Sequence, residues 1–394
     1  PQKLSLLQPA NGTATTLEES REIAHRIGYP IVIRPSYVLG GRAMMIVYDD
    51  EEMAEYFALH VGKQKLEHPV LIDKFLENAI EVDVDALSDG EDVYVAGVME
   101  HIEEAGIHSG DSACSLPPYS LPAETVAEIE RQTVALAKEL RVVGLMNIQF
   151  AVKDGVVFIL EVNPRASRTA PFVSKATGVP LPRLATQVML GKTLKELDPW
   201  SMRRSGYVSV KESVFPFRRF PGVDILLGPE MRSTGEVMGI APTFEEAFLK
   251  GQWGAGQKLP EGGKVFLSVN DRDKRFVAEV ARQYVDLGFE LLATSGTAGL
   301  LAGQGIPSTR VLKVYEGRPN IVDLIKNGEV SLVINTASGK RTAHDSKAIR
   351  QATLHYGVPY STTLSGAKAI ARAIGAARTT EVRVKSLQEY YKGE

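Results

Sequence analysis

Polar and apolar residues alternate along residues 146–152, and residues 156–160 are apolar throughout. These patterns predict two β-strands, and Lys153-Asp154-Gly155 between them predicts a hairpin turn. If these residues form a three-residue loop with Gly155 at positive φ, Val152 faces Val156, and Gln149 lies on the same face as Glu161, diagonally across the pair. A two-residue Asp-Gly turn would separate Gln149 from Glu161, so the register decides which side chains meet.

Further strands are predicted before this hairpin. The helix Leu17–Ile27 precedes a buried strand, Tyr29–Pro35, and shorter strands follow along the chain. We expect these shorter strands at residues 45–48, 70–76, 81–86 and 93–99.

The last third of the chain has a different pattern of predicted elements. Strand patterns at residues 264–269, 289–293 and 331–336 alternate with helical stretches, the first from Asp273 to Leu287. Alternating strands and helices predict a doubly wound parallel sheet, in which ligands sit at the carboxyl ends of the strands. Thr294, Thr297 and Asn335 all fall at such ends. Lys250–Gly263, rich in glycine, predicts a linker or exposed loop before this unit.

Composition fits a globular protein of two or three domains, with 394 residues and 44% hydrophobic content. We find no membrane-spanning run and no secretory signal, and the single cysteine, Cys114, fits the cytoplasm. Residues 264–394 hold 19 Lys and Arg against 12 Asp and Glu, a net charge of +7, which leaves −10 for the rest of the chain. The basic part attracts an anion or presents an ordinary solvated surface.

The candidate chemistry lies where the apolar strand ends. Glu161 and Asn163 are two residues apart and therefore point to one face, whereas Leu160 and Val162 are expected to face a core. Oxygen ligands of this kind suit Mg²⁺, which commonly accompanies a nucleotide. Arg165 and Arg168 add positive charge for phosphate. A solvated edge with a capping asparagine is the alternative, but it would leave these side chains idle together.

Other polar positions carry weaker signals. Arg34 ends a strand before the Gly40-Gly41 loop, whose glycines would let the backbone approach phosphate oxygens. Lys74 would serve as a phosphate or ribose-side cation and Glu81 as a hydroxyl acceptor, although these residues alone favour a plain salt-bridged sheet edge. His108 could titrate near neutrality, but we assign it no acid–base role.

Four motifs together resemble one family, the large chain of carbamoyl-phosphate synthetase. They are residues 34–42, 99–112, 161–165 and 228–239. The resemblance runs from about Leu7 to the C-terminus. This region is similar to the second ATP-grasp half of the family's large chain, followed by a methylglyoxal-synthase-like regulatory unit. It implies an α/β and α+β protein with an ATP-grasp domain at residues 1–255 and a doubly wound allosteric domain at residues 256–394. The chain resembles a fragment of a longer large chain.

The resemblance implies ATP contacts and metal ligands. The ATP contacts are Arg34, Lys74, Leu76, Glu81, Gly106, Ile107, His108, Ser109, Gln149 and Glu161. The ligands of Mg²⁺ or Mn²⁺ are Gln149, Glu161 and Asn163. Arg165 and Arg168 would bind the transferring phosphoryl group or carbamate, because phosphoryl transfer needs positioning and charge neutralisation more than a nucleophilic side chain.

Two effector sites are implied as well. A nucleotide monophosphate such as UMP or IMP would bind at Lys274, Thr294, Thr297, Lys313 and Asn335. Ornithine would bind at Glu103, Asp111, Glu212, Tyr360 and Thr362, a set that an ordinary domain interface also explains. The chain departs from the family at Ala337, where a threonine is common, and at Ser295, where a histidine is common.

The implied activity is ATP- and Mg²⁺-dependent phosphorylation of carbamate to carbamoyl phosphate, for pyrimidine and arginine biosynthesis. The expected partners are a glutaminase small chain and the rest of the large chain, with no nucleic acid and no membrane. A regulatory module that has lost its chemistry is the alternative. A biotin-dependent carboxylase shares the fold but is disfavoured by the regulatory unit.

Overall fold

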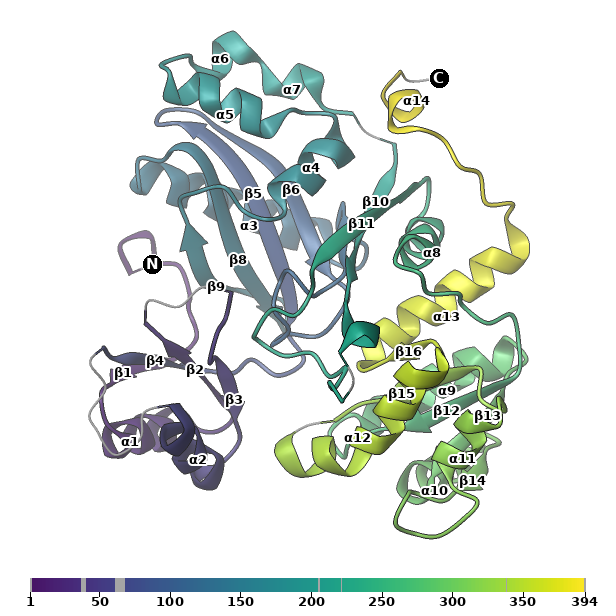
Figure 1. Ribbon diagram of the computed structural model, residues 1–394. Coiled ribbons are helices and arrows are strands. Elements are labelled where there is room, and N and C mark those ends of the chain that lie inside the picture. Colours follow the sequence, from purple (N-terminus) through teal and green to yellow (C-terminus); the bar gives the residue numbers. More distant parts are fainter. Residues whose placement is uncertain are drawn as a thin grey trace.

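The computed structural model describes residues 2–36, 40–60, 68–204, 206–220, 222–337 and 339–392 of the chain (Figure 1). Residues 37–39 of the first family-like motif therefore lie outside the described residues. Three sheets organise the chain, and the first and third lie below the large second sheet in the view of Figure 1. None of the described helices is both long and apolar enough to cross a bilayer.

The first sheet is small and antiparallel, in the order β1-β4-β2-β3. Its elements are β1 (Asn11–Ala14), α1 (Leu17–Ile27), β2 (Ile31–Pro35), β3 (Met45–Val47), α2 (Asp50–His60) and β4 (Val70–Lys74), preceded by the short 3-10 helix η1 (Gln2–Leu4). Helix α1 matches its predicted bounds because Thr16 caps its first turn by accepting the N–H of Glu19, and Gly28 ends it at a φ of 80°. Both helices pack on one face of this sheet.

The second sheet has seven strands in the order β11-β10-β7-β6-β5-β8-β9. Its strands are β5 (Ile80–Asp89), β6 (Val93–His101), β7 (Cys114–Leu116), β8 (Val143–Lys153), β9 (Val156–Asn163), β10 (Val208–Val214) and β11 (Gly235–Ala241). Its helices are α3 (Ala123–Glu139), α4 (Ala170–Thr177), α5 (Leu181–Met189), α6 (Leu194–Leu197), α7 (Pro199–Met202) and α8 (Phe244–Gly254), with the 3-10 turn η2 (Phe217–Arg219).

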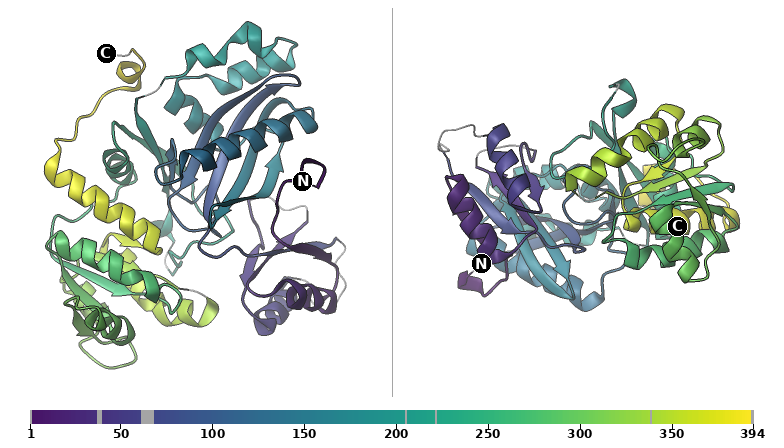
Figure 2. Two further views of the ribbon diagram at one scale, coloured as in Figure 1. Left: turned by 180° about the vertical axis from the view of Figure 1, so that it is seen from behind. Right: turned by 90° about the horizontal axis from the view of Figure 1, so that it is seen from below.

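The alternation along β5 assigns its two faces. Val82, Val84 and Ala86 pack against α3, which lies in front of the sheet in the left view of Figure 2. On the other face Leu87 packs under α4 and α5. Glu81, Asp83 and Asp85 precede Leu87 on that same face, so the face changes from apolar to acidic along one strand. The acidic end is where the site forms.

The third sheet confirms the predicted doubly wound arrangement, with five parallel strands in the order β14-β13-β12-β15-β16. Its strands are β12 (Lys264–Ser268), β13 (Glu290–Thr294), β14 (Thr309–Val311), β15 (Leu332–Asn335) and β16 (Tyr360–Ser361). Its helices are α9 (Lys274–Asp286), α10 (Ser295–Gly303), α11 (Ile321–Lys326), α12 (Gly339–Tyr356) and α13 (Leu364–Thr379), and α14 (Leu387–Lys392) follows.

The predicted linker at Lys250–Gly263 is only partly correct. Residues up to Gly254 complete helix α8, and Gln252 is buried there. Helix α8 packs on one side against β10 and β11 and on the other against α13, so one apolar core runs from the second sheet into the third unit. The run of glycines in the sequence hid this, because Gly251 and Gly254 allow close packing against Glu212 and Val237.

Candidate functional site

The site is a cavity of about 430 Å³ between the first and second sheets. Its floor comes from β5, β8 and β9, whose pairing aligns two rows of polar residues: Asp83, Gln149 and Glu161, then Asp85, Asn147 and Asn163. Asn147 donates hydrogen bonds to Asp83 and Asp85, and Asn163 donates to Glu161 Oε1 at 2.7 Å. Polar side chains therefore run across the three strands: Gln149, Glu161 and Asn163 line the cavity, and Asp83, Asp85 and Asn147 are buried.

The register that brings Gln149 to Glu161 arises differently from the prediction. The hairpin turn has two residues, Asp154 at a φ of 51° and Gly155 at 77°, and Lys153, not Val152, pairs with Val156. Such a turn alone would place Gln149 and Glu161 on opposite faces of the strand pair. The pairing shifts by one residue at Leu160, however, so Gln149 lies directly opposite Glu161.

The same shift corrects the prediction for Leu160. This residue lines the cavity beside Glu161 instead of facing the core. Val162 does pack against the core under α3, as expected. The bulge therefore changes one residue from core to site and keeps the rest of the alternation.

The predicted metal ligands Gln149, Glu161 and Asn163 all line this cavity. Within the residues that the structure describes, no three His, Cys, Asp or Glu side chains cluster as a metal site. The predicted set offers one carboxylate and two carboxamides, and Mg²⁺ bound with a nucleotide commonly takes one or two carboxylates plus phosphate oxygens and waters. The residues therefore fit a metal held jointly with a phosphate ligand.

Every predicted ATP contact lines this cavity, from Arg34 to Glu161. The Arg34 guanidinium lies 2.9 Å from Asp73 and 3.5 Å from Glu161, so it joins the first sheet to the floor. Burial raises the pKa of Asp73, and Arg34 opposes that rise. The prediction missed Asp73, although a carboxylate inside the apolar strand at residues 70–76 was a usable signal.

Lys74 lies differently from a free phosphate cation. Its ammonium donates to the carbonyl oxygens of Gly28 and Tyr29, at 3.0 and 2.7 Å. Burial lowers the pKa of Lys74. The lysine thus ties β4 to the end of α1 at the edge of the cavity, and its charge remains within the site.

The loop after β6 forms the opposite wall. Gly106 has a φ of +100°, and a Cβ there would lie 2.8 Å from Ile46, so only glycine fits. Its N–H donates to Glu81 at 3.0 Å. The Ser109 hydroxyl accepts from Gln149 at 3.0 Å, and the His108 N–H donates to the Gly228 carbonyl at 2.9 Å. Burial lowers the pKa of His108, which agrees with giving it no acid–base role.

The two predicted arginines lie at the open side. Arg165 lines the cavity, whereas Arg168 does not and donates to the Met231 sulfur at 2.6 Å. Both side chains are exposed. They occupy the loop between β9 and α4, which residues Ser167 and Thr169 tie to the buried Asp85. Asp85 was not among the residues predicted for the site.

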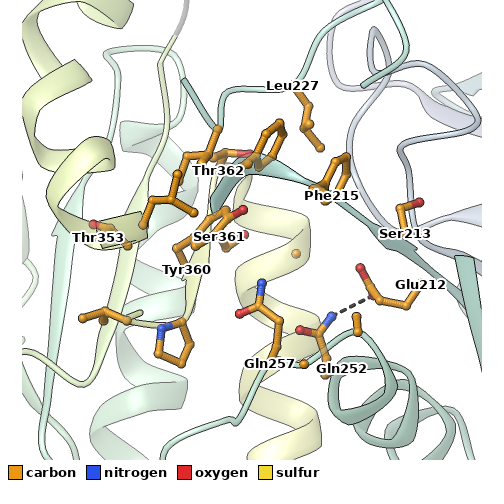
Figure 3. Close-up of a pocket in the computed structure, with 18 of the residues that line it drawn as sticks. Glu212, Ser213, Phe215, Leu227, Gln252, Gln257, Thr353, Tyr360, Ser361 and Thr362 are labelled. Carbon is orange, nitrogen blue, oxygen red and sulfur yellow. Dashed lines mark hydrogen bonds between the residues drawn. The ribbon is translucent and has the colours of Figure 1, made fainter. Parts of the chain in front are cut away.

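A second cavity of about 520 Å³ holds all five residues predicted for ornithine (Figure 3). Gln252 donates to Glu212 at 2.7 Å, the bond dashed in Figure 3. Burial, with the nearby Glu103 carboxylate, raises the pKa of Glu212 to about 8. Asp111 accepts the N–H groups of Arg232 and Ser233, both at 2.8 Å. Buried carboxylates and open space thus occur together, although Asp111 is already engaged by the protein.

The predicted nucleotide-effector residues gather in part at the carboxyl edge of the third sheet. Thr294, Thr297 and Asn335 are buried there. A Cβ on Gly296 would lie 3.2 Å from Lys274 Nζ, so this ammonium lies over the first turn of α10. Lys313 is exposed after β14. Four of the five residues therefore belong to one edge, and Lys313 stands at its margin.

Arg350, which was not predicted as a functional residue, connects this edge to the second unit. Its side chain is 1% exposed, and Nε and Nη2 each lie 2.6 Å from Asp224. Its Nη1 donates to Asn335 at 3.1 Å. No sequence signal marks this pair, because its members lie 126 residues apart.

Two family models match separate parts of the chain. Residues 3–197 match the carbamoyl-phosphate synthase L chain ATP-binding domain, and residues 277–362 match the MGS-like domain. One solved structure, the biotin carboxylase domain of 2-oxoglutarate carboxylase from Hydrogenobacter thermophilus in complex with MgADP, ADP and bicarbonate, covers 64% of this chain and 63% of its own. Its TM-score is 0.50 at 18% identity, which supports the ATP-grasp fold alone.

Relatives match almost the whole chain. The carbamoyl phosphate synthase large chain of Gemmatimonas aurantiaca is 55% identical over 390 residues, which are 99% of this chain and 36% of the relative. The C-terminal section of that large chain from Aquifex aeolicus is 53% identical and is covered to 76% of its length, with 99% of this chain aligned. The chain thus spans about a third of the full large chains it matches and most of the separate C-terminal section.

Proposed function

The chain belongs to the carbamoyl phosphate synthase large-chain family, and from this premise we propose that it transfers the γ-phosphoryl group of ATP to carbamate. One carbamate oxygen forms the new bond to phosphorus while the bond between phosphorus and the β,γ-bridging oxygen breaks. The products are carbamoyl phosphate and ADP. The observation that carries the proposal is the bulged register that sets Gln149 opposite Glu161 within the cavity.

The side chains of the cavity would divide the work of phosphoryl transfer. Arg34 and Arg165 would neutralise charge on the phosphate oxygens, since both line the cavity. Gln149, Glu161 and Asn163 would hold Mg²⁺ or Mn²⁺, which when bound supplies further charge neutralisation. Arg168 would reach the transferring group or carbamate only by leaving Met231, its present partner.

The test is ATP formation from ADP and carbamoyl phosphate with Mg²⁺, the reverse of the proposed step. We expect Glu161→Ala to lower this rate by at least about 100-fold, since positioning and charge terms of this size follow loss of one site ligand. His108→Ala, on the wall of the same cavity, is the matched control and should lose less. Equal losses in the two variants, or no ATP formation by a folded protein that binds ADP, would contradict the proposal.

Regulation belongs to the same proposal. UMP or IMP would bind at the edge of the third sheet, where the Lys274 ammonium and the first turn of α10 favour an anion. A diamino acid such as ornithine would use the buried carboxylates Glu103 and Glu212. Calorimetric titration with UMP, IMP and ornithine tests both. Binding of a nucleotide without any ATP formation would favour the alternative, a regulatory module.

The wider context is proposed on the same family membership. A glutaminase small chain and the rest of the large chain would supply carbamate, and the product would serve pyrimidine and arginine biosynthesis. The proposed division between residues 255 and 256 would separate an ATP-grasp domain, which contains the first family match, from an allosteric domain, which contains the second. A cytoplasmic location agrees with the free, buried Cys114.

A further inference from the structure

Arg165 and Arg168 carry the charge for phosphoryl transfer in the proposed function, yet their own contacts hold them weakly. Arg165 donates to Asn163 Oδ1 at 3.2 Å and to the neighbouring Ala166 carbonyl at 3.0 Å. Arg168 donates to a thioether sulfur, which is a weak acceptor. The backbone of the loop from which both side chains project is held by a separate anchor.

That anchor is a buried carboxylate on the neighbouring strand. Asp85 on β5 is 2% exposed. Its Oδ1 accepts the Ser167 hydroxyl and its Oδ2 the Thr169 hydroxyl, both at 2.7 Å. The two hydroxyls also lie 2.9 Å from each other. Ser167 and Thr169 flank Arg168, so the carboxylate grips the arginine loop on both sides of that residue.

Further hydrogen bonds connect Asp85 and Ser167 to the neighbouring strand and to helix α4. Asn147 donates to Asp85 Oδ1 at 3.1 Å, and Asn147 pairs across the strands with Asn163, a predicted metal ligand. Ser167 Oγ also accepts the N–H of Ala170, the first residue of α4. One carboxylate thus receives three hydrogen bonds that connect the floor of the cavity, the arginine loop and the start of a helix. The carboxylate form suits this role, because it accepts at both oxygens.

We propose that Asp85 is a positioning residue for phosphoryl transfer, which holds the loop 164–169 so that Arg165 and Arg168 meet the transferring group. The inference rests on the proposed function for its catalytic consequence, but the anchoring of the loop is independent of it. Asp85 does not itself line the cavity and acts through Ser167 and Thr169.

Substitutions can separate anchoring from general stability. Asp85→Asn keeps the shape but leaves one acceptor oxygen where Ser167, Thr169 and Asn147 all donate. Thr169→Val removes only the donor, and Thr169→Ser keeps the hydroxyl. The last two form a matched pair at one position, and they keep the test valid if Asp85→Asn does not fold.

The first measurement is amide hydrogen exchange of the full chain, followed by mass spectrometry. We expect residues 165–170 to exchange about tenfold faster in Asp85→Asn and Thr169→Val, with segments 31–35 and 105–109 of the cavity walls unchanged. Thr169→Ser should match the parent protein. Unchanged exchange in the loop, or the same acceleration in all three segments, would overturn the proposal.

The second measurement is function. ATP formation from ADP and carbamoyl phosphate should fall about 100-fold in Asp85→Asn and Thr169→Val, because misplacing groups by about 1 Å costs that much. The Kd for ADP should stay within about threefold, since none of the predicted ATP contacts lies on this loop. Equal loss in rate and in ADP affinity would point to a structural role and refute positioning. If the parent protein forms no ATP, the proposed function fails, while the exchange experiment still decides the anchoring.

Discussion

Replacing Arg350 with methionine should destabilise the protein strongly, because the change strands a carboxylate at the boundary between two units. Arg350 lies on α12, and its partner Asp224 lies in the segment that leads into β11. The guanidinium makes two contacts of 2.6 Å with the carboxylate, a bidentate geometry. Methionine fills much of the same volume and removes all of the donors.

The magnitude follows from burial. The Arg350 side chain is 1% exposed and that of Asp224 is 23% exposed, so water replaces the lost bonds only on the Asp224 side. Hydrogen bonds to charged groups contribute about 1.5–3 kcal/mol each, and breaking a buried pair by removing one partner costs about 3–5 kcal/mol. Since Asp224 keeps some access to water, we expect a loss of about 3 kcal/mol, the lower end of that range.

The assay is urea unfolding at pH 7 of the parent protein, Arg350→Met, Asp224→Asn and the double variant. Because removing both partners leaves no stranded charge, the double variant should lose less than the two single losses added together, with a coupling energy of about 2 kcal/mol. Unfolding should be followed by tryptophan fluorescence and by circular dichroism, since a chain with several units can unfold in stages. A single-variant loss under about 1 kcal/mol, or additive losses, would refute this reasoning.

Acid provides an independent check on the same pair. Burial alone would raise the pKa of Asp224, but the hydrogen bonds and charge of Arg350 bring it below its usual range. A depressed carboxyl pKa contributes stability that is present above the unfolded pKa of about 3.9 and is lost as pH falls towards the lower folded pKa. The difference in stability between the parent protein and Asp224→Asn should therefore shrink as pH falls below about 4.

Three further predictions concern other contacts. Gly239→Ala should destabilise by at least about 1–3 kcal/mol in urea unfolding, because a Cβ there would lie 1.9 Å from the Ala247 carbonyl of α8; Gly235→Ala on the same strand meets nothing within 4 Å and is the control. Glu212→Gln should stabilise increasingly as pH rises from about 5 to about 8, because burial raises the pKa of Glu212 to about 8, so that over this range the unfolded state has lost the proton that the folded state still holds; an effect independent of pH would contradict this. Lys211→Met should weaken ADP binding in calorimetry, because the buried ammonium donates to the carbonyls of Ser109 and Ser112, at 3.2 and 2.5 Å, in the loop that forms one wall of the cavity. Unchanged affinity would show that this loop keeps its conformation without Lys211.

The sequence predicted the elements well where a local signal exists. The Thr16 cap and Gly28 stop define α1, and the alternation of strands and helices defines the parallel sheet. It was less accurate at Lys250–Gly263, where glycines that suggested a loop instead let α8 pack closely. Glycine marks both flexibility and close approach, and the sequence alone does not separate the two.

The candidate site shows the same limit in a sharper form. The residues that line the cavity could be predicted because the family motifs identify them one by one. Asp85 and Arg350 went unnoticed because their importance lies in partners far along the chain, such as Asp224 for Arg350. Long-range pairing is the information that local patterns do not contain.

The hairpin between β8 and β9 shows most clearly what local patterns leave out. Asp154-Gly155 favours a two-residue turn, and local chemistry alone would then have placed Gln149 and Glu161 on opposite faces. One extra residue, Leu160, restores the alignment, and the cost is an unpaired position within β9. A bulge beside a cluster of polar ligands agrees with the tendency of bulges to re-aim side chains at functional sites. Deleting Leu160 should therefore remove the bulge and still leave Glu161 opposite Gln149 on the site face, because Glu161 would then follow Ile159 in regular pairing. We expect a folded deletion variant to keep ATP formation from ADP and carbamoyl phosphate, whereas loss of this activity in a folded variant would show that the alignment of Gln149 with Glu161 is not sufficient.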